Sequence, residues 1–252
     1  MDKEPKVKTI LVSQPQPENG KSIFDDVAAK YKLKVDFRSF IQVDAVAGKD
    51  LRKKKLNILE HTAVIFNSKN AVDHFFRVVD ELRVELPPDM KYFCMSENIG
   101  LYIQKYTVMR KRKVFFPKVS TENDFLNLIM VHKNEKYLFP CSDIRRNAIP
   151  DFFEKNNLKL TESIMYRTVS ADLSDLENVF YDIIVFFSPA DIKSLFDNFP
   201  NFSQNKTRIA AFGDTTQKAL AEANLFCNIP APAPGTPSIA SAIEAYVKKS
   251  NS

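Results

Sequence analysis

Six short apolar runs constrain the fold of this chain most strongly, because each is rich in β-branched and aromatic residues and is followed by sequence with helical periodicity. Continuous apolar runs are typical of strands that are buried on both faces of a sheet. Such strands, when they alternate with helices, predict an α/β fold with parallel sheets. The runs span residues 9–13, 63–67, 92–95, 137–140, 183–188 and 208–213.

The strand–helix pattern occurs twice, over residues 10–106 and over residues 137–223. The last two strand ends of each half have similar spacing, from Ser68 to Ser96 and from Ser188 to Gly213. A length of 252 residues also suits two domains. We therefore interpret the chain as a weak internal duplication that forms two similar α/β domains.

Two segments alternate between apolar and polar residues and do not fit the pattern of buried strands. They span residues 35–43 and, less regularly, 164–169. Each lies about one strand–helix unit after the start of its half. We expect them to form paired ribbon strands that cross between the domains.

Several classes of protein are excluded by scarce residue types. The five glycines lack the spacing of a dinucleotide fingerprint, a P-loop or a nucleophile elbow. The cysteines and histidines lack the spacing of a zinc site, and three scattered cysteines fit a reducing compartment better than a disulfide framework. We expect no metal and interpret these side chains as packed or surface residues, namely Cys94, Cys141, Cys227, His61, His74 and His132.

The charge pattern does not indicate nucleic-acid binding. A net charge of +5 is only mildly basic. The basic runs 52–55 and 110–113 (Arg110-Lys111-Arg112-Lys113) are not interleaved with aromatic residues, so we interpret them as solvated faces. Attraction of nucleic acid or an acidic partner is the weaker alternative. The charged N-terminus and the short apolar runs predict a cytoplasmic protein without a signal peptide or membrane span.

Small hydroxyl side chains lie where each predicted strand passes to a helix. In parallel α/β sheets, ligands bind at the carboxyl ends of strands, and helix N-termini there attract anions. On two facing domains, these positions predict a cleft for a ligand with many carboxylates. Helix capping alone is the alternative at each position. The residues are Ser13, Ser68, Ser96, Ser142, Ser188, Thr215 and Thr216, and we expect Arg208 to lie close to the Gly213–Thr216 turn and face the same cleft.

Several segments together resemble the uroporphyrinogen-III synthase family. Residues 66–72 (FNSKNAV) and 187–189 (FSP) resemble its FTS-x-NAV and FFSP turns, and residues 208–220 (RIAAFGDTTQKAL) are similar to its aaIGpTTA-x-AL segment. Weaker matches lie at 140–146, 166–168 and 231–239, so the ordered set covers nearly the whole chain. Two turns depart from the family: Gln14 replaces an arginine, and Glu97 is an acid where a neutral residue is usual.

The resemblance implies two Rossmann-like or flavodoxin-like parallel-sheet domains joined by a two-stranded antiparallel linker. One domain would combine residues 1–36 and 170–252, the other would span 44–162, and the linker strands would lie at about 35–43 and 163–169. The implied reaction cyclises hydroxymethylbilane to uroporphyrinogen III, with inversion of ring D and loss of water, in heme biosynthesis. No cofactor is implied. The implied protein is a monomer that binds the linear tetrapyrrole and transiently contacts the preceding pathway enzyme.

The resemblance also implies site residues. Tyr166 would donate a proton to the departing hydroxyl, and its alternative role is that of a strand aromatic packing between domains. A second reading of the whole chain is a non-catalytic anion-binding or regulatory protein of the same fold. The implied substrate-binding residues are Ser13, Asn67, Ser68, Asn70, Ser96, Ser142, Arg145, Ser188, Pro189, Arg208, Gly213, Thr215 and Thr216.

Overall fold

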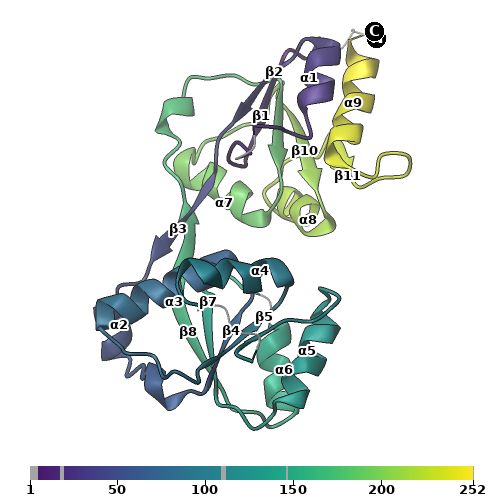
Figure 1. Cartoon of the computed structure of the whole chain (residues 1–252). Coiled ribbons are helices and arrows are strands. Elements are labelled where there is room, and N and C mark those ends of the chain that lie inside the picture. The colour runs from purple at the N-terminus through teal and green to yellow at the C-terminus, as the bar shows by residue number, and fades with distance from the viewer. Residues whose placement is uncertain (1–4, 18–19, 109–111, 146, 252) are drawn as a thin grey trace. The chain divides into compact units, whose positions relative to one another are not determined.

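A computed structural model describes residues 5–17, 20–108, 112–145 and 147–251, and the chain divides into two units (Figure 1). Unit 1 combines Met1–Gln42 with Val169–Ser252, and unit 2 is Val43–Thr168. Unit 2 is therefore an insertion in unit 1. Arg110 and Lys111 of the second basic run, and Arg146 of the 140–146 segment, lie outside the described residues.

Unit 1 is built on a five-stranded parallel sheet with the order β11-β10-β9-β1-β2. Its strands are β1 (Thr9–Val12), β2 (Lys34–Phe37), β9 (Ile183–Phe186), β10 (Arg208–Phe212) and β11 (Ile229–Ala231). Its helices are α1 (Asp25–Tyr31), the 3-10 helix η3 (Ser174–Leu176), α7 (Pro189–Asn198), α8 (Asp214–Glu222) and α9 (Ile239–Ser250).

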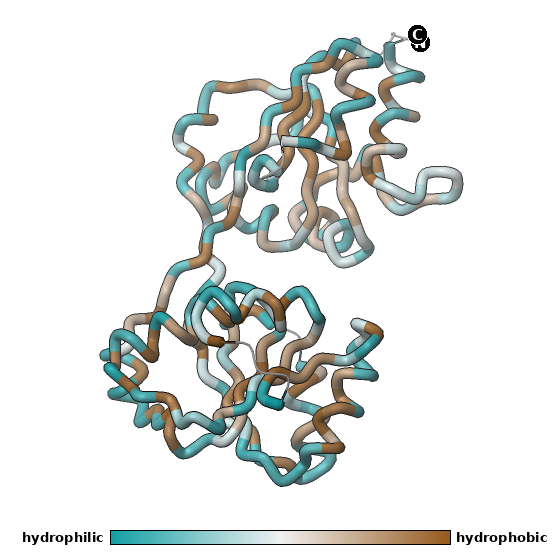
Figure 2. Tube along the Cα trace, viewed as in Figure 1, coloured by the Kyte–Doolittle hydropathy of each residue, from teal (hydrophilic) through white to brown (hydrophobic). Residues whose placement is uncertain are grey.

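Both faces of this sheet are covered, as continuous apolar strands predict. In β9, Ile183 and Val185 pack in one cluster with residues of α1 and α9. Ile184 and Phe186 point the other way and pack with residues of α7 and α8. Figure 2 shows the hydrophobic colour concentrated along these strands. The core of unit 1 therefore consists of two apolar layers, one on each side of the sheet.

Unit 2 is built on a six-stranded sheet with the order β3-β8-β7-β4-β5-β6. Its strands are β3 (Ile41–Ala45, which begins in unit 1), β4 (Ala63–Phe66), β5 (Lys91–Cys94), β6 (Val114–Phe115), β7 (Tyr137–Ser142) and β8 (Leu160–Ser170, which ends in unit 1). Its helices are α2 (Gly48–Lys53), η1 (Ile58–Glu60), α3 (Lys69–Leu82), α4 (Glu97–Tyr102), η2 (Ile103–Lys105), α5 (Glu122–Val131) and α6 (Ala148–Lys155).

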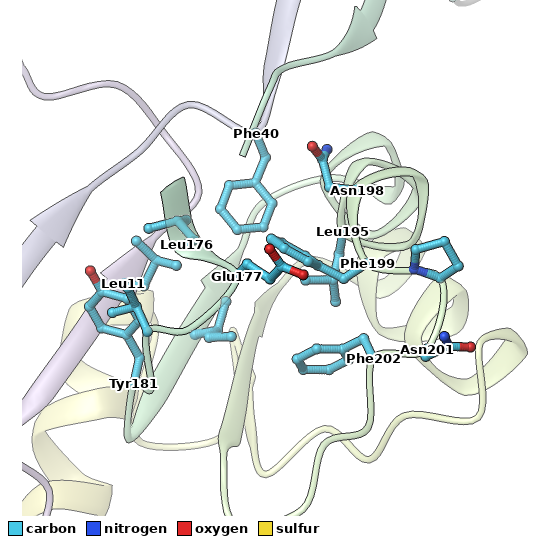
Figure 3. A pocket seen from close by; sticks show the side chains of 13 residues that line it. Leu11, Phe40, Leu176, Glu177, Tyr181, Leu195, Asn198, Phe199, Asn201 and Phe202 are labelled. Atoms are coloured by element: carbon cyan, nitrogen blue, oxygen red, sulfur yellow. The ribbon is translucent and has the colours of Figure 1, made fainter. Parts of the chain in front are cut away.

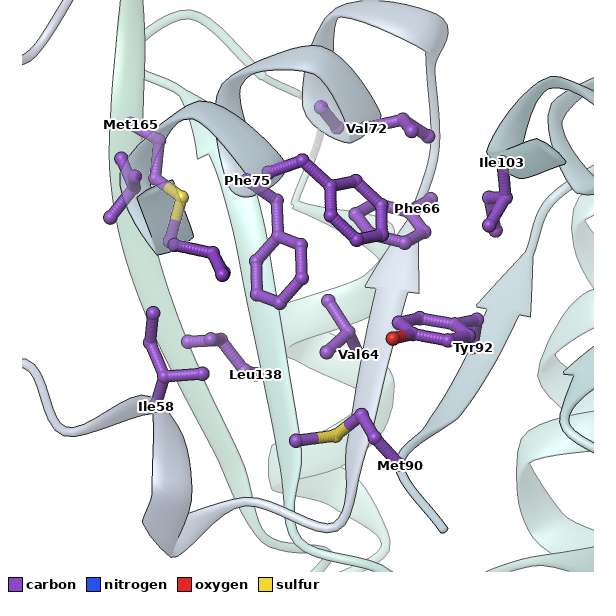
Figure 4. Packing of buried hydrophobic residues seen from close by; sticks show 14 of the residues in the cluster. Ile58, Val64, Phe66, Val72, Phe75, Met90, Tyr92, Ile103, Leu138 and Met165 are labelled. Carbon is purple, nitrogen blue, oxygen red and sulfur yellow. The ribbon is translucent and has the colours of Figure 1, made fainter. Parts of the chain in front are cut away.

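Phenylalanine is the most frequent residue type in the core of unit 2. On one face of the sheet, Val64 and Phe66 of β4 pack with Phe75 of α3 and Tyr92 of β5 (Figure 4). On the other face, Ile65 packs in a cluster with residues of α5 and α6. Successive residues of β4 therefore serve opposite layers, and all four are buried.

The two sheets share one strand order, which supports the predicted duplication. Reading from β2, unit 1 has β2-β1-β9-β10-β11, and reading from β8, unit 2 has β8-β7-β4-β5-β6. The units β4–α3–β5–α4 and β9–α7–β10–α8 occupy equivalent places in this order. The positions predicted as equivalent strand ends therefore follow equivalent strands.

The structure differs from the predicted linker strand at 35–43. Residues 34–37 form β2, which pairs in parallel with β1 in the sheet of unit 1, and β3 begins only at Ile41. The alternating pattern arises because β2 is a half-covered edge strand, and such a strand alternates much as a ribbon does. β3 pairs with β8: Ala171 N–H donates to Phe40 O (2.9 Å), and Val46 N–H donates to Met165 O (3.0 Å), which is an antiparallel progression.

Candidate active site

In unit 1, the ends of β1 and β9 are joined by a buried carboxylate. Asp191, in the first turn of α7, accepts hydrogen bonds from Ser13 Oγ (3.0 Å) and from the backbone N–H groups of Phe187 (3.0 Å) and Ser188 (2.9 Å). Burial raises the pKa of Asp191, and these donors oppose that rise. Asp191 thus joins the ends of β1 and β9 through Ser13 Oγ and the Ser188 backbone, whereas the Ser188 hydroxyl is buried without a hydrogen-bond partner among the described residues. Pro189 occupies the first position of α7, where a missing N–H costs nothing.

The next strand end in unit 1 is an uncapped helix N-terminus. Gly213 precedes α8 with φ +85°, a conformation that favours glycine, and makes no side-chain cap. Thr216 is fully buried, and its Oγ1 has no hydrogen-bond partner among the described residues. Thr215 is exposed. The free N–H groups of this first turn and an unpaired buried hydroxyl suit an anionic ligand.

In unit 2, two of the predicted hydroxyls cap helices and one does not. Ser68 Oγ accepts from Ala71 N–H (3.1 Å) at the start of α3, and Ser96 Oγ accepts from Ile99 N–H (3.4 Å) at the start of α4. Ser142 is the last residue of β7, and α6 begins only at Ala148, so the expected direct passage from strand to helix is wrong there. Ser142 Oγ instead donates to the carboxylate of the next residue, Asp143 (3.0 Å).

Two asparagines flank the start of α3. Asn70 is exposed in its first turn, and Asn67 precedes the capping serine. The side-chain oxygen of Asn67 is buried and has no hydrogen-bond partner in the described part of the chain. A buried amide oxygen of this kind accepts a donor from a ligand or from water at little cost, because leaving it unpaired is unfavourable.

Tyr166 and Ser68, which lie in separate segments of the chain, meet at this edge. The Tyr166 hydroxyl lies 3.2 Å from Ser68 Oγ, and either group can donate. The Tyr166 ring is buried in the core of unit 2, and it stacks on the His74 ring at 4.9 Å between centroids and 18° between planes. Burial raises the pKa of Tyr166, and the contact with Ser68 opposes that rise. Ser142 pairs with Tyr166 across β7 and β8, so three predicted residues come together.

The two predicted arginines are already engaged in contacts within the protein. Arg145 Nε donates to Glu162 Oε2 (2.6 Å). Arg208 begins β10, whereas Gly213 follows its end, so the predicted position beside the Gly213–Thr216 turn is wrong. At ~3.3 Å per residue the strand separates its ends by about 13 Å. Arg208 is buried, donates to the carbonyl of Pro5 and pairs with Asp182 (3.9 Å), so its role is structural.

A cluster on α3, α4 and η2 was not found from the sequence. The Asp73 carboxylate accepts from the hydroxyls of Tyr102 (2.9 Å) and Tyr106 and from Lys105 Nζ (3.3 Å). Burial opposes ionisation of Asp73, but these donors lower its pKa below the ordinary value. Lys69, the first residue of α3, lies over the Tyr102 ring at 5.2 Å. The spacing of Tyr102, Lys105 and Tyr106 marks one helical face, but their partner on α3 follows only from the fold.

A separate pocket of about 360 Å³, lined by apolar and polar side chains, lies in unit 1 (Figure 3). Leu11, Phe40, Leu195, Phe199 and Phe202 line it together with the segment that precedes β9. None of the predicted site residues lines this pocket. It is therefore distinct from the polar strand ends.

The described residues hold no group of three or more His, Cys, Asp or Glu side chains arranged for a metal ion. Burial raises the pKa of the Cys94 thiol and raises that of Cys141 to about 11, so neither is an activated nucleophile. Within the part of the chain that the structure describes, no helix is both long and apolar enough to pass through a membrane.

Two parallel-sheet units with hydroxyls and helix N-termini at their carboxyl edges define an α/β protein suited to anionic ligands. Residues 26–241 match the family described as Uroporphyrinogen-III synthase HemD, and the chain belongs to this family. The chain is 29% identical to the uroporphyrinogen-III synthase of Saccharomyces cerevisiae over 125 residues, which is 43% of this chain and 45% of that protein. The match thus spans less than half the length of the yeast relative.

Solved structures of the family share the fold. Uroporphyrinogen-III synthetase from Helicobacter pylori is similar with a TM-score of 0.60 at 16% identity, over 96% of this chain and 99% of that chain. A mutant uroporphyrinogen III synthase from Thermus thermophilus gives 0.52 at 11% identity, over 96% and 98%. The predicted α/β class is thereby confirmed, with two sheets in which parallel pairing dominates.

Proposed function

We propose that this protein closes hydroxymethylbilane to uroporphyrinogen III, with inversion of ring D and loss of water. The observation that carries the proposal is the hydrogen bond between Tyr166 and Ser68 at a carboxyl edge, in a chain that belongs to the synthase family. The lyase class, the independence of cofactors, the cytoplasmic location and the monomeric state are parts of this proposal, as is a transient contact with the preceding pathway enzyme.

The polar strand ends would bind the acetate and propionate arms of the substrate. The first turn of α8 offers backbone N–H groups and the unpaired hydroxyl of Thr216. The starts of α3 and α4 add the positive ends of two further helices, and Lys69 places a cation at the first residue of α3. That the two units bind one substrate together stays a prediction of the sequence.

Tyr166 is proposed to protonate the hydroxyl that leaves as water. Ser68 Oγ accepts from Ala71 N–H, so its own proton can be donated to the Tyr166 oxygen. The phenol O–H is then directed at the leaving group. As the carbon–oxygen bond breaks, the phenol proton joins the hydroxyl to form water, and Ser68 stabilises the negative charge that develops on the phenol oxygen.

Control of substrate shape is proposed to be the larger part of catalysis. The linear tetrapyrrole closes without help, but to the type I isomer. The protein must hold ring D so that its substituted carbon attacks. Binding energy from carboxylates far from the reacting carbon can be used for this orientation. Because Tyr166 is buried and its pKa is raised, it assists as a donor without being indispensable.

The isomer composition of the product tests the proposal. Hydroxymethylbilane is generated by the preceding enzyme in the presence of the full chain, and the products are oxidised and separated. The proposal predicts that the type III isomer predominates. Type I alone, the same as without the protein, would reject it. If the chain then still bound the substrate, the non-catalytic anion-binding reading would replace it.

A further inference from the structure

One guanidinium on α3 contacts three different parts of the structure around Tyr166. Arg77 Nε donates to His74 Nδ1 (3.3 Å), and Arg77 Nη2 donates to the carbonyls of Val46 (2.8 Å) and Met165 (3.1 Å). Arg77 Nη1 pairs with the Glu81 carboxylate, which also accepts from Gly48 N–H (2.6 Å). Arginine presents its donors in a fixed planar fork, so these contacts set its orientation.

We propose that Arg77 is a positioning residue for Tyr166: it holds the imidazole of His74 against the phenol ring, and it fixes the backbone of Met165, the residue before Tyr166. The inference rests on the proposed function in one respect, namely the role of Tyr166 as a proton donor. Neither Arg77 nor His74 belongs to the residues that the sequence indicated for the site.

The contact from Arg77 determines the form of His74. Arginine only donates, so His74 Nδ1 must accept, and the neutral ring carries its proton on Nε2. Burial, together with the charge of Arg77, lowers the pKa of His74, while Asp73 and Glu81 act in the opposite direction. The ring stacked on Tyr166 is therefore uncharged at neutral pH. An uncharged neighbour leaves Tyr166 protonated, as its role as a donor requires.

The backbone contacts fix the other side of Tyr166. The Met165 carbonyl accepts from Arg77 and also from Val46 N–H (3.0 Å). Val46 directly follows β3, and Met165 lies in β8, so one guanidinium joins the two strands beside Tyr166. A shift of the guanidinium would move the peptide that carries Tyr166 as well as the ring that stacks on it. A displacement of about 1 Å is enough to disturb the alignment of a catalytic group with a reacting group.

A double-mutant cycle tests the inference through activity. Arg77→Met is expected to lower kcat about tenfold, with KM for hydroxymethylbilane changed less than about twofold, because the substrate is bound elsewhere and only the donor is displaced. Tyr166→Phe/Arg77→Met is expected to be no slower than Tyr166→Phe alone, since Arg77 acts through the phenol. Losses that multiply would overturn the inference. Lys53→Met, which removes an exposed lysine from α2, is the matched control.

Nuclear magnetic resonance tests the same contacts without any activity. In the wild type, the ¹⁵N shifts of His74 should show an unprotonated Nδ1 and a protonated Nε2. In Arg77→Met, a mixture of tautomers, a higher His74 pKa and shifted Tyr166 ring signals are expected. Unchanged His74 and Tyr166 signals would overturn the inference. Arg77→Lys keeps the charge but not the fork, so it should show the mixture of tautomers and the shifted Tyr166 ring signals with a smaller rise in the His74 pKa. It replaces Arg77→Met if that variant does not fold.

The kinetic cycle and the resonance experiment together distinguish failure of the inference from failure of the proposed function. If the wild type produced no type III isomer, the proposed function would fail. The resonance experiment would still decide whether Arg77 positions His74 and Tyr166. If the wild type were active and Tyr166→Phe were slow, but Arg77→Met and Arg77→Lys kept full kcat, only the positioning role would fail.

Discussion

Ser68→Ala separates the two roles of this serine, as the cap of α3 and as the partner of Tyr166. Loss of a serine cap costs about 1 kcal/mol in the free energy of unfolding. Loss of a hydrogen bond to a charged group costs about 1.5–3 kcal/mol. Because charge develops only partly on the Tyr166 oxygen, we take about 1.5 kcal/mol, which corresponds to roughly a tenfold loss in kcat.

Thr121→Ala is the matched control. Thr121 caps α5 in the same unit, and its Oγ1 accepts from Asp124 N–H at 3.1 Å, the same distance as in the Ser68 cap. Both variants should therefore lose about 1 kcal/mol in urea unfolding, and only Ser68→Ala should lose turnover in the assay of type III product. Wild-type kcat in Ser68→Ala, or an equal loss in Thr121→Ala, would refute the assignment of Ser68 as donor to Tyr166.

Four further variants follow from the structure. Thr216→Val should raise KM about tenfold without loss of stability, because it removes a buried hydroxyl that has no partner; an unchanged KM would exclude Thr216 from binding. Tyr166→Phe should lower kcat by roughly ten- to a hundredfold in steady-state assays, and full turnover would exclude an acid role. The pKa of His74 is below its ordinary 6.5 in the folded state, so folding stability should fall as the pH drops through about 6.5; His74→Gln should lose less stability between about pH 7.5 and about pH 5.5, and equal losses would contradict the assignment. Phe66→Ala, in the centre of the unit 2 core, should cost about 3–5 kcal/mol in urea unfolding, whereas a loss under about 1 kcal/mol would contradict the packing described.

The buried strands and the strand-end residues could be predicted because local sequence determines them. A run such as Ile183–Phe186 is apolar at every position only if both faces are covered, and both are. Ser68 caps α3 by accepting from Ala71 N–H, three residues further along the chain, so its position at the helix start could also be predicted.

The misplaced residues depend on contacts that are distant in sequence. Arg208 was expected beside the Gly213–Thr216 turn, but it begins β10, at the end opposite that turn, where it pairs with the partly buried Asp182. β2 lies at the edge of its sheet, so its sequence alternates between apolar and polar residues, and this pattern predicted a linker strand. Arg77 shows no signal in the sequence, because the carbonyls that it binds, those of Val46 and Met165, lie 31 and 88 positions away in the chain.

A structure with the product bound tests the central claim most directly. The account predicts carboxylates of the tetrapyrrole within hydrogen-bond distance of the first turn of α8, and the Tyr166 hydroxyl close to the carbon that lost its oxygen. A tetrapyrrole bound instead in the pocket beside Phe40 and Phe199, with no contact to Thr216 or Tyr166, would contradict it.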